Sequence, residues 1–179
     1  MKTNIVLIGF MATGKTTVAK AISQKLGKKY VSTDDMVAEK SKKTITQIFK
    51  EEGEKEFRRL EMEAIEKASR MRNAVIDCGG GAVLNRINME RLKQGGVIIL
   101  LKASPKVVLG RNLRDDGKRP LLEVKDQASV IRELLASRTP LYQNSADYEV
   151  DTTNLTVEEV VDKVVEIFQN TGDRSAGSC

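Results

Sequence analysis

Residues 9–17 constrain what this chain can fold into more than any other part of its sequence. They read GFMATGKTT and directly follow the apolar run NIVLI at residues 4–8. The first eight of them, 9–16, fit the pattern G-x-x-x-x-G-K-[ST] without a mismatch, between a predicted strand and a predicted helix. Such glycines let consecutive N–H groups point inward, and the dipole of the following helix adds positive potential. The sequence therefore predicts a P-loop that holds the phosphates of a nucleoside triphosphate.

The side chains of this loop have distinct expected roles. Lys15 is placed to reach the β- and γ-phosphates, and the Thr16 hydroxyl is placed to ligate Mg²⁺. We expect the nucleotide to contact the whole run Ala12, Thr13, Gly14, Lys15, Thr16 and Thr17. An ordinary glycine-rich turn between a strand and a helix would need neither the lysine nor the threonine at this spacing.

Apolar runs alternate with helical patterns along the rest of the chain. Strands are predicted at 4–8, 30–33, 74–77, 97–101 and 147–151. Helices are predicted at 15–26, 35–41, 45–71 with a break at Gly53, 87–94, 105–113, 126–143 and 156–169. This alternation predicts right-handed crossovers and a three-layer α/β fold of the P-loop NTPase type, in which helices flank a five-stranded parallel sheet.

The chain of 179 residues is expected to form one domain over residues 1–170. The charged, glycine-containing segment RNLRDDGKRPLL at 111–122 predicts a mobile lid at about 112–124. The small polar residues of 171–179 predict a disordered tail.

Composition excludes several classes of chemistry. The chain has no histidine and only two cysteines, Cys78 and Cys179, so the usual zinc sites and histidine-activated nucleophiles are excluded. The net charge of +5 comes from lysines interleaved with glutamates, and aromatic residues make up only 4%. We therefore expect no nucleic-acid binding. With no targeting or membrane-spanning segment apparent, a cytoplasmic protein is expected.

Three groups of residues indicate what accepts the phosphoryl group. Asp34 and Asp35 follow the second predicted strand, at the same edge of the sheet as the P-loop, where a carboxylate can orient a hydroxyl. Asp34 could also be a helix N-cap, but its location at this edge favours the functional role. The glycines at 79–81 follow the third strand and would let a ligand approach the backbone closely. Three arginines could match a carboxylate or phosphate with two parallel hydrogen bonds: Arg58, Arg119 and Arg138.

These motifs together resemble the shikimate kinase family over residues 4–168. The resemblance includes the P-loop, the acid after the second strand, IFKEEGEKEFRRLE, GGGAV, RPLL and RTPLY. The ordered combination F-R-x-x-E, GGG, R-P-L-L and R-x-P-x-Y is far more specific than the P-loop alone. The resemblance implies transfer of the γ-phosphoryl of ATP to the 3-hydroxyl of shikimate, with Mg²⁺ required. The fold class suggests a monomer.

The resemblance also assigns roles to individual residues. Asp34 would bind the ring hydroxyls as a base or as an orienting group. Arg58 and Arg138 would clamp the substrate carboxylate, and Gly80 and Gly81 would line the ring. The nucleotide side would include Arg119 on the transferring phosphoryl, Arg111 packed on adenine, and Asn154 in the loop that holds the base.

Three positions depart from the family pattern. The family usually has D-T-D after the second strand, whereas residues 32–34 here read Ser-Thr-Asp. Asp77 stands where serine or alanine is common, so we hypothesise that it supplies the metal carboxylate that Ser32 lacks, although it could merely cap the glycine turn. Ala12 stands where glycine is common; a positive φ there would strain the loop and weaken ATP binding.

Two other functions remain open from the sequence. One is another P-loop metabolite kinase, such as a gluconate kinase, since gluconate is also a carboxylate. The other is a ligand-sensing domain that kept the fold and lost catalysis, for which Ser32 and Ala12 are the only support. Retention of Lys15, Thr16, Asp34 and Arg119 argues against it.

Overall fold

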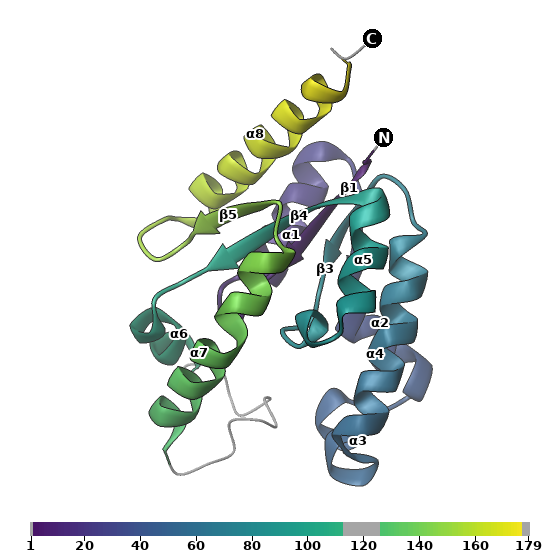
Figure 1. Cartoon of the computed structure of the whole chain (residues 1–179), viewed down its shortest axis with the longest axis vertical. Coiled ribbons are helices and arrows are strands. Elements are labelled where there is room, and N and C mark those ends of the chain that lie inside the picture. Colours follow the sequence, from purple (N-terminus) through teal and green to yellow (C-terminus); the bar gives the residue numbers. More distant parts are fainter. Residues whose placement is uncertain (1, 113–125, 177–179) are drawn as a thin grey trace.

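Five parallel strands form the centre of the protein (Figure 1). The structure is a computed structural model, and it describes residues 2–112 and 126–176. The strands run in the order β2-β3-β1-β4-β5. Their bounds are β1 Asn4–Ile8, β2 Lys29–Ser32, β3 Ala74–Asp77, β4 Gly96–Lys102 and β5 Tyr148–Asp151. The predicted five-stranded parallel sheet is confirmed, and each strand lies within a few residues of its predicted position.

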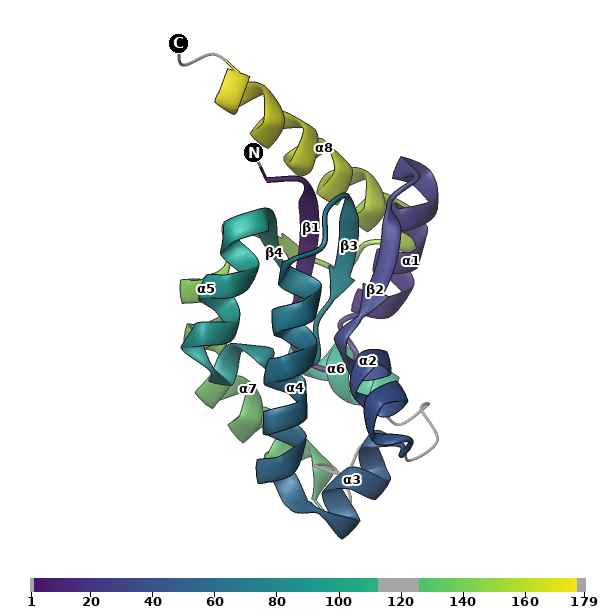
Figure 2. The same cartoon turned by 90° about the vertical axis from the view of Figure 1, so that its right-hand side faces the viewer.

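Helices cover both faces of this sheet, as Figure 2 shows. Alternate side chains of β1 point to opposite faces: Ile5 and Leu7 join the core beneath α1 (Lys15–Leu26) and α8 (Val157–Ala176). Val6 and Ile8 join the core on the opposite face. That face is covered by α4 (Gly53–Ser69), α5 (Arg86–Gly95) and α7 (Gln127–Ser145). The predicted three-layer architecture is confirmed.

A small additional core lies beyond the sheet, where α2 (Thr33–Ser41) and α3 (Ile45–Glu51) pack against α4. Its buried side chains include Val37, Ile48 and Phe57. A capping box at Thr44 starts α3, and Gly53, with φ of 83°, separates α3 from α4 as predicted. This packing fixes α4, which carries two of the charged side chains of the site described below.

The chain reverses its direction of winding between β1 and β3. The connection after β1 passes through α1 towards β2, whereas the connection after β3 passes through α5 on the other face towards β4. β1 and β3 are hydrogen-bonded neighbours, with Leu7 opposite Asp77. In open α/β sheets, ligands bind beyond the carboxyl ends of the strands at such a switch point. The P-loop and the glycine turn both begin there.

The structure differs from the sequence-based predictions at a few boundaries. A short 3-10 helix, η1 (Ala82–Leu84), was not predicted, and α5 begins at Arg86, one residue before the predicted start. Helix α8 reaches Ala176, beyond the predicted end at residue 169, so it includes part of the segment expected to be a disordered tail. Helix α6 (Pro105–Asn112) ends where the predicted lid begins, and the rest of that lid, with Arg119, lies outside the described residues. None of the described helices is long and apolar enough to cross a membrane.

Candidate functional site

Backbone geometry explains both glycines of the P-loop. Gly9 has φ of 148°, and a Cβ atom there would collide with the carbonyl oxygen of Leu101 on β4. Gly14 caps α1 with φ of 91°, a conformation that costs most other residues free energy. The loop thus leaves the end of β1 and enters α1 through two positions that favour glycine.

The charged and hydroxyl side chains of the loop are held by hydrogen bonds. The Lys15 ammonium donates to the carbonyl oxygens of Gly9 at 2.9 Å and Phe10 at 2.8 Å, and the residue is only 8% exposed. The Thr13 hydroxyl donates to the Phe10 carbonyl at 2.8 Å. Thr16 donates to Oδ2 of Asp77 at 2.6 Å. The loop is therefore folded around its own lysine, with Thr16 tied to the neighbouring strand.

Asp77 ends β3 directly opposite Ser32 of β2, because the two residues are partners in the parallel register. Ser32 itself caps α2 by accepting a hydrogen bond from the Asp35 N–H at 3.1 Å. Burial raises the pKa of Asp77, while the nearby Lys15 charge and the Thr16 hydroxyl act in the opposite direction. A carboxylate on β3 thus lies one strand away from residue 32, at the same level of the sheet.

Asp34 lies in the first turn of α2, facing the glycine turn. Its Oδ1 atom is buried and makes no hydrogen bond with the described residues. Burial raises the pKa of Asp34, and repulsion from Asp77 adds to the effect. A Cβ atom on Gly79 would lie 2.5 Å from this same oxygen, so the glycine turn makes room for the carboxylate. An unpaired buried acceptor indicates a position where a ligand donor completes the hydrogen bonding.

Two arginines and a buried glutamate lie next to Asp34. Arg58 on α4 donates to Glu61 at 2.8 Å, and Glu61 is only 1% exposed. Arg138 on α7 is 6% exposed, and its charge also acts on Glu61. The Arg58 guanidinium lies against Gly81 so closely that a Cβ atom there would collide with it. The three side chains form a charged cluster beside the glycine turn, with Glu61 and Arg138 buried and Arg58 partly exposed.

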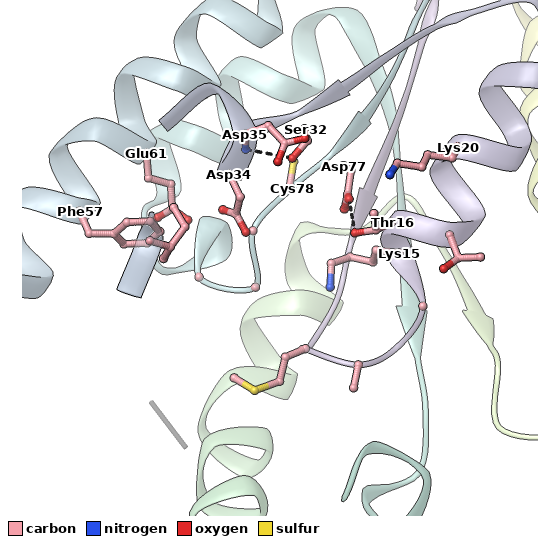
Figure 3. Close-up of a pocket in the computed structure, with 18 of the residues that line it drawn as sticks. Lys15, Thr16, Lys20, Ser32, Asp34, Asp35, Phe57, Glu61, Asp77 and Cys78 are labelled. Carbon is pink, nitrogen blue, oxygen red and sulfur yellow. Dashed lines mark hydrogen bonds between the residues drawn. The ribbon is translucent and has the colours of Figure 1, made fainter. Parts of the chain in front are cut away.

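One cavity of about 700 Å³ joins the phosphate loop to this charged cluster. Figure 3 shows Lys15, Thr16 and Asp77 on one side of it and Asp34, Phe57 and Glu61 on the other. Most of the residues predicted to form the site line it: Ala12, Gly14, Lys15, Thr16, Thr17, Asp34, Arg58, Asp77, Gly80, Gly81, Arg111 and Arg138. The cavity has room for a nucleotide tail and a small acidic alcohol side by side.

Some predicted site residues lie outside the cavity, and others have additional structural features. Thr13 is buried behind the loop and Asn154 is exposed in the β5–α8 connection, and neither lines the cavity. Arg111 lines the cavity and donates to the carbonyl oxygen of Ala12 at 3.1 Å. Ala12 has φ of 59°, so this alanine adopts the left-handed conformation that the sequence analysis identified as strained.

Three polar residues of the site were given no role in the sequence analysis, although two of them, Glu61 and Tyr142, end motifs that it quoted. Glu61 follows Arg58 by three positions, a spacing at which helical side chains pair, and this could have identified it. Tyr142 follows Arg138 by four positions on α7 and donates to the Gly80 carbonyl. Burial raises the pKa of Tyr142 to about 12, so its hydroxyl stays protonated as a donor. Tyr30 was assigned only to a strand, yet it lines the cavity and contacts Asp77.

A glycine-rich loop lies at the switch point of the parallel sheet, and one cavity joins it to a cluster of arginines. This arrangement defines a P-loop enzyme that brings the phosphates of a nucleotide to a small anionic acceptor. The sequence model of shikimate kinase matches residues 11–169. This chain belongs to the shikimate kinase family.

Relatives of known name support this assignment. A shikimate kinase of Caldanaerobacter subterraneus subsp. tengcongensis is 47% identical over 92% of this chain and 95% of that protein. One from Thermoanaerobacter pseudethanolicus is 43% identical over the same shares. Among solved structures, the shikimate kinase of Acinetobacter baumannii in complex with shikimate has a TM-score of 0.90 at 33% identity, covering 96% of this chain and 95% of that one.

The same comparisons weigh against the alternatives from the sequence. A gluconokinase of Sinorhizobium meliloti covers 97% of both chains with a TM-score of 0.60, but at 17% identity it shares only the fold. The family match favours shikimate kinase over gluconate kinase. It also favours a catalytic protein over a domain that only senses a ligand.

Proposed function

We propose that this protein transfers the γ-phosphoryl group of ATP to the 3-hydroxyl of shikimate, giving shikimate 3-phosphate and ADP. The observation that carries the proposal is the single cavity that joins the P-loop to Asp34, Arg58 and Arg138. The relative from Acinetobacter baumannii was solved with shikimate, which supports the choice of acceptor. The hydroxyl that reacts is assigned from the family resemblance.

The acceptor side would bind and orient shikimate. Arg58 and Arg138 would hold its carboxylate, because guanidinium groups pair with carboxylates through two parallel hydrogen bonds. Gly80 and Gly81 line the cavity and would lie against the ring. Asp34 would accept a hydrogen bond from the reacting hydroxyl. Its raised pKa also makes its carboxylate a better proton acceptor than an ordinary aspartate.

The nucleotide side would hold ATP through the loop N–H groups and Lys15. During transfer the hydroxyl oxygen bonds to the γ-phosphorus, the bond from that phosphorus to the bridging oxygen breaks, and the hydroxyl proton passes to Asp34 or to the product phosphate. Arg119 would neutralise charge on the transferring group, while Arg111 and Asn154 would contact the nucleotide base. Of these three, only Arg111 lines the cavity as described.

The chemistry of the side chains fits Mg²⁺ held by Thr16 and Asp77. Magnesium prefers oxygen ligands and keeps several waters, so a hydroxyl, a carboxylate and the phosphates suffice. No cluster of three or more metal-ligating side chains occurs in the part of the chain that the structure describes, which agrees with such a sparse site. When bound, the ion would neutralise charge on the β- and γ-phosphates.

The register between Ser32 and Asp77 provides a direct test of the metal carboxylate. Asp77→Asn should lower turnover and Mg²⁺ dependence by orders of magnitude. Adding Ser32→Asp should restore much of both, because it returns a carboxylate to the same level of the sheet and aspartate can still cap α2. Asp77→Asn with unchanged kinetics would refute the role of Asp77.

A coupled assay of ADP release tests the substrate. We expect turnover of roughly 1–100 per second with MgATP and shikimate, the usual range for kinases. Gluconate in place of shikimate should give only background hydrolysis. Shikimate-independent ADP release, or preference for gluconate, would overturn the proposal.

We also propose that the enzyme works in the cytoplasm as a monomer, without nucleic acid or membrane. The interleaving of its lysines with glutamates supports this, because no basic block is available for either surface. Light scattering of the purified protein would reveal any larger assembly.

A further inference from the structure

Asp77 has a hydrogen-bond partner outside the phosphate loop. Tyr30 of β2 donates its hydroxyl proton to Oδ2 of Asp77 at 3.3 Å. The Lys20 ammonium of α1 lies over the Tyr30 ring, 5.5 Å from its centroid. Both side chains line the cavity, and Figure 3 shows Lys20 reaching towards Asp77 from the same helix as Thr16. The carboxylate is therefore contacted from α1 and from β2.

Both hydrogen bonds to this carboxylate end on the same oxygen. Thr16 donates to Oδ2 at 2.6 Å, and Tyr30 donates to Oδ2 from the neighbouring strand. Oδ1 accepts no hydrogen bond from any residue in 2–112 or 126–176. Two donors on one oxygen restrict rotation of the carboxyl group and leave the second oxygen for another partner. Asp77 lines the cavity, so that partner would come from the cavity side.

We infer that Tyr30 is a positioning residue for the metal-binding carboxylate: it fixes Oδ2 of Asp77 so that Oδ1 is offered to the ion or to one of its waters. This inference rests on the role of Asp77 in the proposed function. Groups that orient the ligands of a metal contribute to affinity although they never touch the ion, and their loss typically weakens binding about 10- to 100-fold. The 3.3 Å distance is long for a hydroxyl donor, so we expect the lower end of that range.

Tyr30→Phe removes only the hydroxyl, and with it the contact with Asp77, and keeps the ring under Lys20. The affinity of Mn²⁺ for the complex of protein with ADP can be measured from the electron paramagnetic resonance signal of free Mn²⁺. We expect about 10-fold weaker Mn²⁺ binding in Tyr30→Phe. ADP affinity in the presence of EDTA should stay unchanged, because the loop itself is intact.

Two further variants make the measurement specific. Tyr148→Phe on β5 is the matched control, since Tyr148 is also partly buried but contacts Thr171 instead of the site; its Mn²⁺ affinity should equal that of the wild type. In an Asp77→Asn background, Tyr30→Phe should cause no additional loss, because the two residues act through one contact.

The inference is overturned by any of three results. One is a Tyr30→Phe protein that binds Mn²⁺ as tightly as the wild type. Another is that Tyr30→Phe weakens Mn²⁺ binding as much in the Asp77→Asn background as in the wild-type background. The third is a matching loss of ADP affinity in EDTA, which would place the effect on the loop. Wild-type turnover with shikimate is measured separately. Its absence refutes the proposed substrate, whereas normal turnover with unaltered Mn²⁺ binding in Tyr30→Phe refutes only the role of Tyr30.

Discussion

The two sides of the cavity differ in how completely their polar groups are satisfied. On the phosphate side, Lys15, Thr13 and Thr16 already make hydrogen bonds of 2.6 to 2.9 Å within the protein. On the acceptor side, Oδ1 of Asp34 and Oε1 of Glu61 are buried and have no hydrogen-bond partner among the described residues. The lysine and threonines of the phosphate side are thus already paired within the protein, whereas the acceptor side carries buried carboxylate oxygens that await a ligand.

The unpaired carboxylate oxygens of the acceptor side affect the stability of the fold. A buried carboxylate oxygen without a donor costs stability, and functional sites commonly retain such costs for the sake of binding. Burial raises the pKa of both Asp34 and Glu61, which reflects the same penalty. We therefore expect removal of the Lys15 charge on the phosphate side to abolish activity without stabilising the fold. Removal of the Asp34 charge on the acceptor side should both lower activity and stabilise the fold.

The largest effect is expected from Lys15→Met. This change removes the charge that would stabilise the transferring phosphates, and we expect kcat/KM for MgATP to fall about 1,000-fold. Lys29→Met, at an exposed lysine of β2, is the control and should leave the rate unchanged. Steady-state kinetics decide the matter, and a loss below tenfold would show that the loop does not act on the phosphates.

Arg138→Lys tests the acceptor side. A lysine keeps the charge but loses the planar pair of donors, so we expect KM for shikimate to rise about 10- to 100-fold. Nucleotide affinity should not change, because the charge of Arg138 acts on Glu61 and Tyr142 of the acceptor side. Arg132→Lys, at an exposed arginine of the same helix, is the matched control. Equal effects on both substrates would contradict the division of the cavity into two sides.

The difference between the phosphate side and the acceptor side also explains what could be predicted from the sequence. The phosphate side is a contiguous run, residues 9–17, so its spacing alone identifies it. The five strands were likewise predicted, because their apolar runs are local signals, and even the break at Gly53 was visible. Features that depend on neighbours in the sequence are accessible without a structure.

The acceptor side is assembled from elements far apart in the chain. Arg58 and Glu61 come from α4, Arg138 and Tyr142 from α7, and Asp34 from α2. Family resemblance identified Asp34, Arg58 and Arg138, but no local rule shows that Glu61 is buried and that the distant Arg138 acts on it. The contact of Tyr30 with Asp77 depends on the order β2-β3-β1, which the sequence does not specify.

Asp34→Asn separates activity from stability. We expect turnover to fall about 100- to 1,000-fold, because the amide cannot accept the hydroxyl proton. The free energy of unfolding at neutral pH should rise by about 1 kcal/mol, because a buried charge without a donor is removed. Asp35→Asn, at an exposed carboxylate in the same helical turn, should instead lower stability slightly by removing a favourable charge from the start of α2.

The pH dependence of this gain follows from the sign of the pKa shift. The pKa of Asp34 is raised in the folded protein, so the folded state holds more protons between the ordinary value of about 3.9 and the raised value. The contribution of Asp34 to the free energy of unfolding is therefore fully present below the pKa of an ordinary aspartate, and it is lost as pH rises through the raised pKa of the folded protein. Urea unfolding at several pH values should show the advantage of Asp34→Asn growing as pH rises. A constant advantage would contradict this account.

The smallest effect is expected from Ala12→Gly, which tests whether the phosphate side is strained. Glycine adopts the φ of 59° found at residue 12 without steric cost, but it loses more entropy on folding, so the net gain in stability should be about 0.5 to 1 kcal/mol. Lys42→Gly, at another left-handed position far from the loop, should give a similar gain.

Nucleotide affinity distinguishes two forms of this strain. The left-handed conformation of Ala12 is already present in the loop without nucleotide, and the Arg111 guanidinium donates to its carbonyl oxygen. Strain that is common to the free and bound loop cancels from the binding free energy. We therefore expect the ATP affinity of Ala12→Gly to stay within about twofold of the wild type, measured by calorimetry. A gain of tenfold would instead show that binding increases the strain, as the sequence analysis had expected.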